Sequence, residues 1–288
     1  MLTIFERGRI EENCDAIAKH SKNLHGPLKV RFAEGLQTLM KNPLQYEPKR
    51  STLTFCRKEW SEFLVKRGVV QAAEMNAVKK LPVERMQRLR NDIAAMRAFL
   101  ACVNPRIVEL LDLIVAEILV IQVAKPEAGS HSAAIGMIWI NPDETWSTKY
   151  LAEIVFHELL HNILFLEDMT RGLMPDMELL ESDHTRAFSA VRKTGRFFDS
   201  AFHAAFVTVG MMWFYHVSSK LVRGGQTARI AECITLGRKA VSDLKRIAAQ
   251  QEAAGRPILT ANGNELLSAM ASFFETPDFE SINSLLEV

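Results

Sequence analysis

The segment HELLH, residues 157–161, contains two histidines and a glutamate, the side chains in this sequence whose types and spacing point most clearly to chemistry. Residues i and i+4 of an α-helix lie on one face, so the imidazoles of His157 and His161 could bind one metal ion. Glu158 lies about 100° further round the helix and could reach a water molecule or the open side of that metal. The segment therefore predicts a metal site on a helix.

The elements that must position this segment are a helix and a preceding strand. Residues 150–156 lead into the motif without proline or glycine, as in a buried helix. Residues 134–140 are largely apolar and end at Asn141-Pro142, which predicts a strand. A single strand must pair with another, and residues 42–57 contain a candidate partner.

A catalytic metal needs at least one further protein ligand, with positions left open for water or substrate. Four polar residues after the motif could also be ligands, and each is expected instead to be a surface or second-sphere residue: Glu178, Glu181, Asp183 and His184. A fifth residue, His216, is expected to be a core or surface histidine, because it points away from His203 on a helix.

His203 is the preferred third ligand. It lies in the apolar stretch 197–207, where a polar ring requires a partner when it is buried. On a continuous helix Arg192, Arg196 and Asp199 would fall within about 40° of His203. A guanidinium group there could pair bidentately with a carboxylate, as an oxygenase that binds an α-keto acid at iron requires. The alternative is that both arginines are exposed charges at the start of a helix.

Composition and charge restrict the class of protein. The chain is 48% hydrophobic and 24% charged, with a net charge of +1, so it has no overall field that attracts nucleic acid or anionic lipid. Its four cysteines are scattered, and residues 1–7 contain no apolar signal segment. The apolar runs 107–123 and 201–217 are interrupted by charged residues or histidines. We therefore expect a soluble, cytoplasmic protein that binds neither nucleic acid nor membrane.

Residues 79–90 form the most basic stretch of the chain. Its Lys79, Lys80, Arg85, Arg88 and Arg90 are accompanied by two acidic residues in or next to the stretch. A solvated helix face is the expected explanation, and a docking strip for an acidic peptide is the alternative.

Helical periodicity dominates the chain, so we predict a mainly α fold with a small β element near 134–140, before the HExxH helix. A helical N-terminal lobe at residues 1–123 and a metal-site lobe at 124–288 are expected to pack as one unit. The predicted helices are 4–21, 27–41, 58–77, 82–103, 105–123, 147–166, 177–193, 196–218, 226–251, 262–274 and a short one near 278–286.

Several segments together resemble one family. The segments GSHS at 129–132 and IGMIWINP at 135–142 precede the HExxH helix, and Arg192, Arg196 and FHAAFV at 202–207 follow it. Over about residues 90–217 this order resembles the HExxH-motif peptide-modification proteins, which include α-ketoglutarate-dependent HExxH-type peptide β-hydroxylases.

The resemblance implies an oxygenase that uses Fe(II), O2 and α-ketoglutarate to hydroxylate Cβ of a residue in a ribosomally made precursor peptide. It implies that His157, His161 and His203 are iron ligands. It also implies that Arg196, with Arg192 in reserve, binds the co-substrate carboxylate. Glu158 would then act from outside the ligand set, by orienting a ligand or a water molecule.

Two other functions are consistent with the sequence. The first is a cytosolic HExxH zinc metallopeptidase, in which Glu158 is the general base and strand 134–140 holds the substrate as an added strand. The second is a helical binding protein without catalytic activity. The sequence leaves open the substrate peptide, the hydroxylated residue and the oligomeric state.

Overall fold

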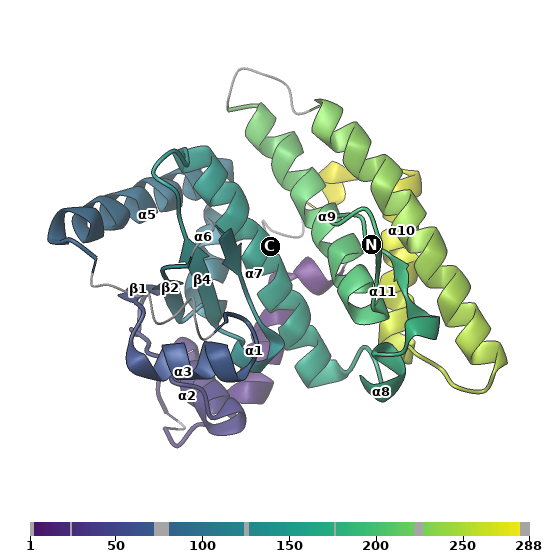
Figure 1. Cartoon of the computed structure of the whole chain (residues 1–288), viewed down its shortest axis with the longest axis horizontal. Coiled ribbons are helices and arrows are strands. Elements are labelled where there is room, and N and C mark those ends of the chain that lie inside the picture. Colours follow the sequence, from purple (N-terminus) through teal and green to yellow (C-terminus); the bar gives the residue numbers. More distant parts are fainter. Residues whose placement is uncertain are drawn as a thin grey trace. The chain divides into compact units, whose positions relative to one another are not determined.

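The computed structural model describes residues 3–23, 25–71, 81–123, 127–175, 177–221 and 227–282 (Figure 1). The protein is mainly helical and contains a small sheet, as predicted. The chain divides into two compact units: unit 1 is Met1–Ile10 with Leu166–Val288, and unit 2 is Glu11–Phe165. The lobe boundary expected at residue 123 therefore lies inside unit 2.

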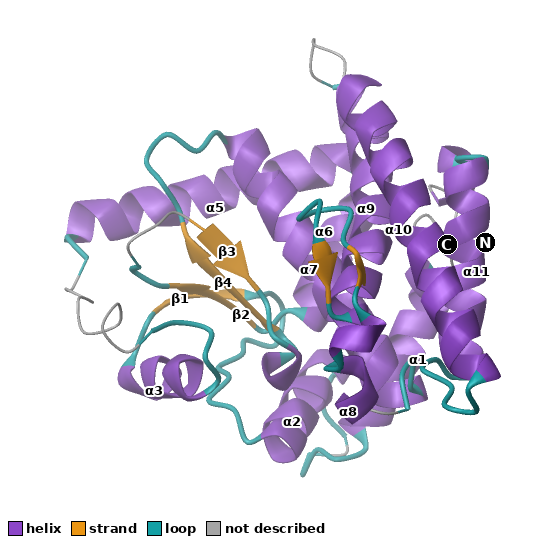
Figure 2. Ribbon diagram, turned by 45° about the vertical axis from the view of Figure 1, so that its right-hand side comes forward, coloured by secondary structure: helices purple, strands orange, loops and turns teal. Residues whose placement is uncertain are grey.

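Unit 2 contains a four-stranded sheet in the order β1-β2-β4-β3 (Figure 2). Three strands run parallel to their neighbours, and β3 at one edge is antiparallel to β4. The register pairs Leu53 with Ile118 and Ile118 with Ile138. The strands are β1 (Thr52–Phe55), β2 (Glu117–Val120), β3 (Glu127–Gly129) and β4 (Met137–Asn141). The strand predicted near 134–140 and the candidate within 42–57 are thus confirmed.

The predicted helix 105–123 is correct only in its first half. Helix α6 (Pro105–Ile114) begins at the N-cap Asn104, whose side chain accepts a hydrogen bond from the backbone N–H of Arg106, and β2 follows it. Residues 114–121 are all buried. A parallel strand buried on both faces has no alternation of apolar and polar residues, so its sequence looks like that of a buried helix.

The other helices predicted in the first half of the chain are present. They are α1 (Arg7–Ala18), α2 (Leu28–Met40), α3 (Lys58–Lys66) and α5 (Val83–Val103), followed after β4 by α7 (Thr148–Arg171). The second half of the predicted helix 58–77, from residue 72, lies outside the described residues, as do Lys79 and Lys80.

A buried carboxylate joins the first two strands of unit 2 to α3. Glu117, at the start of β2, is completely buried. It accepts hydrogen bonds from Arg57 at 2.7 Å, from the indole of Trp60 at 2.9 Å and from the hydroxyl of Thr54. Its charge is therefore compensated by a guanidinium group, as a buried carboxylate requires.

Unit 1 is built around α9 (Phe198–Ser219), which is apolar on nearly all sides and largely buried. It packs against α10 (Thr227–Ala253) and α11 (Ala261–Glu275). Gly237 of α10 lets these last two helices approach closely, because a Cβ at that position would lie 2.1 Å from the ring of Phe274. None of the described helices is long and apolar enough to cross a membrane.

The first residues of the chain belong to unit 1. Ile4 and Phe5 are buried, and the ring of Phe5 stacks on that of Phe206 at a centroid distance of 5.2 Å. The guanidinium group of Arg9 donates to the buried carboxylate of Glu167 and, at 2.7 Å, to Oδ1 of Asn262. These contacts hold the N-terminal segment against α9, α11 and the end of α7.

The predicted helix 177–193 is wrong beyond its first turn. Helix α8 (Met177–Leu180) is followed by a 3-10 turn at Asp183–Thr185 and by a hairpin of β5 (Ala187–Phe188) and β6 (Gly195–Arg196). The hydroxyl of Thr185 donates to the backbone carbonyl of Leu179 in α8 and to that of Ser182 after this helix. Lys193 adopts φ +56° in the hairpin turn. This positive φ is incompatible with a right-handed helix.

The later helix predictions are confirmed in position by α9, α10 and α11. Within the last predicted helix, 278–286, residues 279–282 are helical and the remainder lies outside the described residues.

Candidate metal centre

Helix α7 presents the two motif histidines of unit 2 on one face. The ring centroids of His157 and His161 are 5.0 Å apart, with an angle of 63° between the ring planes. Both side chains are partly exposed. Imidazole nitrogens bind metals at about 2.1 Å, so two rings at this separation fit one shared ion. The donor set on α7 is therefore compatible with a metal.

Glu158, the carboxylate of the HELLH motif, lies beside this histidine pair. It is 7% exposed, and its Oε1 lies 4.0 Å from Nε2 of His157. Burial raises the pKa of Glu158 to about 7, and a hydrogen bond from Ser130 partly opposes this increase. A carboxyl group with a pKa near neutrality can give or take a proton at physiological pH.

Ser130 holds the other oxygen of this carboxylate. Its Oγ lies 2.8 Å from Oε2 of Glu158, directly after edge strand β3. Gly129 brings this strand close to β4, because a Cβ there would lie 2.6 Å from the ring of Trp139. Ser130 is one of the residues that carry the family resemblance, but the sequence gives it no role. Its hydrogen bond to Glu158 joins residues 28 positions apart, which local spacing does not predict.

Asn162 fixes α7 to the sheet immediately after the second histidine. Its side chain is completely buried and accepts a hydrogen bond from the backbone N–H of Gly136 at 2.8 Å. Its amide donates to the backbone oxygen of Glu158 at 3.0 Å. Gly136 has φ +89°, so this position before β4 favours glycine. Asn162 thus positions the motif, a role that its place in the sequence does not indicate.

The proposed third ligand, His203, lies on α9 in unit 1. Desolvation lowers its pKa to about 4, so its imidazole is neutral, which is the form that binds metals. The residues considered as other ligands, Glu178, Glu181, Asp183 and His184, are all exposed. Asp183 accepts a hydrogen bond from Arg186 at 2.7 Å. His216 stacks on Phe279 at 4.4 Å and is a packing residue, as expected.

Contrary to the prediction, Arg192 and Arg196 do not lie on one continuous helix with His203. Arg192 lies in the turn of the β5–β6 hairpin and Arg196 on β6, so neither belongs to the helix that carries His203. Both side chains are exposed. Asp199, which is on α9, lies one turn before His203 as expected.

Within the described residues, no group of three or more His, Cys, Asp and Glu side chains is arranged to hold a metal ion. Unit 2 contributes His157, His161 and Glu158 from α7, and His203 belongs to unit 1. The structure thus brings His157 and His161 together as a pair with Glu158 beside His157, and it gives this pair no third ligand among the described residues.

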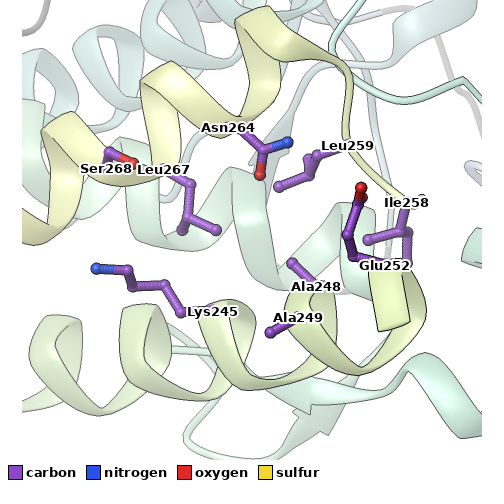
Figure 3. Close-up of a pocket in the computed structure, with 9 residues that line it drawn as sticks. All are labelled: Lys245, Ala248, Ala249, Glu252, Ile258, Leu259, Asn264, Leu267 and Ser268. Atoms are coloured by element: carbon purple, nitrogen blue, oxygen red, sulfur yellow. The ribbon is translucent and has the colours of Figure 1, made fainter. Parts of the chain in front are cut away.

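A separate cavity in unit 1 contains none of these residues. It lies between α10 and α11 and has a volume of about 260 Å³ (Figure 3). Buried Leu259 and Leu267 form part of its floor, and exposed Lys245 and Glu252 lie at its rim. This cavity is not part of the HExxH site.

No protein-family model matches the chain, and no curated protein matches its sequence.

Proposed function

We propose that this protein is an Fe(II)- and α-ketoglutarate-dependent oxygenase that hydroxylates Cβ of a residue in a ribosomally made precursor peptide. The observation that supports a metal-dependent enzyme is the pair of imidazoles at 5.0 Å on α7, beside a buried carboxylate. The order of motifs in the sequence supports the choice of an oxygenase.

The proposed iron ligands are His157, His161 and His203. Imidazole is a suitable ligand for Fe(II) and Zn(II) alike, and the low pKa of His203 keeps its ring in the neutral form. Iron, when bound, supplies the activation of O2 that allows a C–H bond to be hydroxylated. The protein supplies the ligands and the orientation of the substrates.

Other residues are assigned to binding and positioning. In the proposal the exposed guanidinium group of Arg196, or of Arg192, pairs with a carboxylate of α-ketoglutarate. Glu158, held by Ser130, orients a ligand or a water molecule through its own charge and hydrogen bonds.

The edge strand β3 is the better candidate for binding the peptide backbone. Strand β4, to which the metallopeptidase alternative gives this role, has β2 on one side and β3 on the other. It therefore has no free edge for an added strand. Strand β3 ends at Gly129, directly before Ser130, so a peptide paired with β3 would lie near Glu158.

A zinc metallopeptidase is the second candidate, and one specific observation favours it. Glu158 is buried, has a pKa near 7 and has one oxygen 4.0 Å from Nε2 of His157. A general base works best when its pKa lies near the working pH. In this alternative Glu158 takes a proton from the attacking water, and zinc replaces iron.

The cellular setting is also part of the proposal. We place the protein in the cytoplasm, because Cys14, Cys56, Cys102 and Cys233 are all free thiols. Its proposed partner is the precursor peptide that it hydroxylates.

Succinate formation tests the proposal directly. The protein would be incubated anaerobically with Fe(II), α-ketoglutarate and a candidate peptide, and then exposed to O2. We expect succinate, together with a peptide that has gained one oxygen atom. Retention of zinc by protein purified without added metal, absence of succinate and cleavage of the peptide would instead establish the metallopeptidase.

A further inference from the structure

A second cavity lies entirely within unit 2 and contains none of the HExxH residues. Its volume is about 340 Å³. The stripe Arg90, Ile93, Ala94 and Arg97 of α5 faces Leu53 of β1 and Ile118 of β2, whose positions are paired in the sheet. This spacing places the four α5 residues on one side of the helix. The cavity therefore has apolar walls and basic residues around it.

The charges around this cavity do not cancel. Arg97 is neutralised, since it pairs with Asp112 at 2.6 Å and also donates to the hydroxyl of Ser51. Arg50 lies 3.4 Å from Glu47, but both side chains are at least half exposed, so this pair contributes little. Arg90 pairs with no carboxylate among the described residues and lies over the ring of Phe55 at 5.6 Å. One positive charge therefore remains beside β1.

The neighbouring residues of the basic stretch behave differently. Arg85 and Arg88, on the same helix, both lie within 4.0 Å of Glu144, at 3.6 and 3.9 Å. Their charges are thus partly compensated at the surface. Of the described arginines in that stretch, Arg90 is the one that lines the cavity and lacks an acidic partner.

Strand β1 provides backbone groups next to the same cavity. The backbone N–H of Thr52 donates to the carbonyl of Ala116, just before β2, at 2.9 Å, and that of Cys56 donates to Val120 of β2 at 2.8 Å. Because backbone groups alternate in direction along a strand, Leu53 and Phe55 turn their N–H and C=O groups away from β2. In the part of the chain that the structure describes, no hydrogen bond reaches these outward groups. Strand β1 is thus an edge strand beside a positive charge.

We propose that β1 and this cavity bind an extended acidic peptide segment, which adds to the sheet at β1 and places a carboxylate at Arg90 and Arg50. Backbone pairing with Leu53 and Phe55 would provide the register, since alternate side chains of an added strand point to one face. In a peptide whose acidic residues alternate with β-branched ones, the carboxylates would all point to the face that carries Arg90, and the β-branched residues between them would favour the extended conformation. This site goes beyond the proposed function and does not depend on the chemistry at α7.

Binding of a labelled peptide tests this proposal. The probe is a fluorescein-labelled octapeptide in which glutamates alternate with valines, and its binding to the full chain is followed by fluorescence anisotropy. We expect Arg90→Glu to weaken binding by about tenfold or more, because an attraction becomes a repulsion. Arg88→Glu, a charge reversal two residues away and outside the cavity, should change affinity by less than about twofold. Circular dichroism checks that both variants remain folded.

Modified probes separate strand addition from simple charge attraction. A peptide with glutamine in place of glutamate should bind at least about tenfold more weakly. N-methylation of those backbone nitrogens that would face β1 should abolish binding, whereas N-methylation of the alternate set should not. Equal effects of Arg90→Glu and Arg88→Glu, or equal binding of the two N-methylated peptides, would overturn the proposal. Displacement of the peptide by an equal concentration of glutarate would also overturn it, because the site would then recognise a small anion.

Discussion

The hydroxyl of Ser130 lies 2.8 Å from Oε2 of Glu158 and so connects the end of an edge strand to the HExxH helix. This contact leaves Oε1 of Glu158 directed towards the histidine pair, 4.0 Å from Nε2 of His157. The position of the carboxylate is therefore determined by the sheet as well as by its own helix.

Replacement of Ser130 by alanine should reduce turnover about tenfold without loss of bound metal. The reason is that Glu158 loses the hydrogen bond that orients it, and such a bond to a charged group contributes about 1.5 kcal/mol or more. Turnover and metal content of the variant would be measured together. Ser130→Thr should restore much of the activity, and Ser132→Ala, at an exposed position nearby, serves as the control. Unchanged turnover in Ser130→Ala would contradict this role.

Replacement of Glu158 by glutamine distinguishes the two candidate enzymes. An oxygenase should keep measurable succinate formation, because this carboxylate orients groups and is not consumed as a base. A metallopeptidase should lose nearly all turnover, because its general base is removed. Single-turnover assays of succinate and of peptide cleavage provide the measurement.

Metal binding should depend on three histidines. His157→Ala, His161→Ala and His203→Ala should each remove the metal, because a catalytic metal site generally needs three protein ligands. His216→Ala is the matched control and should retain metal, since that ring stacks on Phe279. Elemental analysis after reconstitution with Fe(II) gives the result. Loss of metal in His184→Ala, with retention in His203→Ala, would show that the third ligand is misassigned.

Asn162→Ala should lower the free energy of unfolding by about 2 to 4 kcal/mol. The variant leaves the backbone N–H of Gly136 buried without its partner and removes a second hydrogen bond to Glu158. Urea denaturation would measure the change. Asn91→Ala, at an exposed position of α5, should alter stability by less than about 0.5 kcal/mol. An equal, small effect of both substitutions would exclude Asn162 as an anchor.

Stability should fall above about pH 9, in part because of Cys14. Burial raises the pKa of this thiol, so the folded protein keeps the proton at pH values where the unfolded chain has lost it. The resulting stabilisation is complete below the unfolded pKa and is lost as the pH rises, by up to about 1.4 kcal/mol per pH unit. Cys14→Ala should flatten this part of the curve, measured by urea denaturation between pH 8 and 11. Cys102→Ala, at an exposed thiol, should leave the slope unchanged.

The sequence predicts those parts of the fold that depend on local periodicity. The histidine pair follows from its i, i+4 spacing, and most helices follow from their apolar stripes. The sequence does not predict strand β2, because complete burial removes its alternation of apolar and polar residues. It does not predict the β5–β6 hairpin either, because a non-glycine residue, Lys193, occupies the left-handed turn position.

Long-range partners could not be predicted in the same way. Ser130 and Asn162 are ordinary polar residues in the sequence, and their roles arise from contacts with Glu158 and Gly136 across the fold. The predicted placement of Arg192 and Arg196 beside His203 requires a helix that continues through residue 196, whereas α9 begins at Phe198.

The stacking of Phe5 on Phe206 has a consequence for biosynthesis. About 200 residues separate the two rings, so at typical elongation rates of about 5 to 20 residues per second the N-terminal segment is made at least about 10 s before α9. During this interval Ile4 and Phe5 lack their final neighbours, although the residues of unit 2 have already been synthesised. We therefore expect the nascent chain to expose an apolar segment that is available to chaperones until the last helices leave the ribosome.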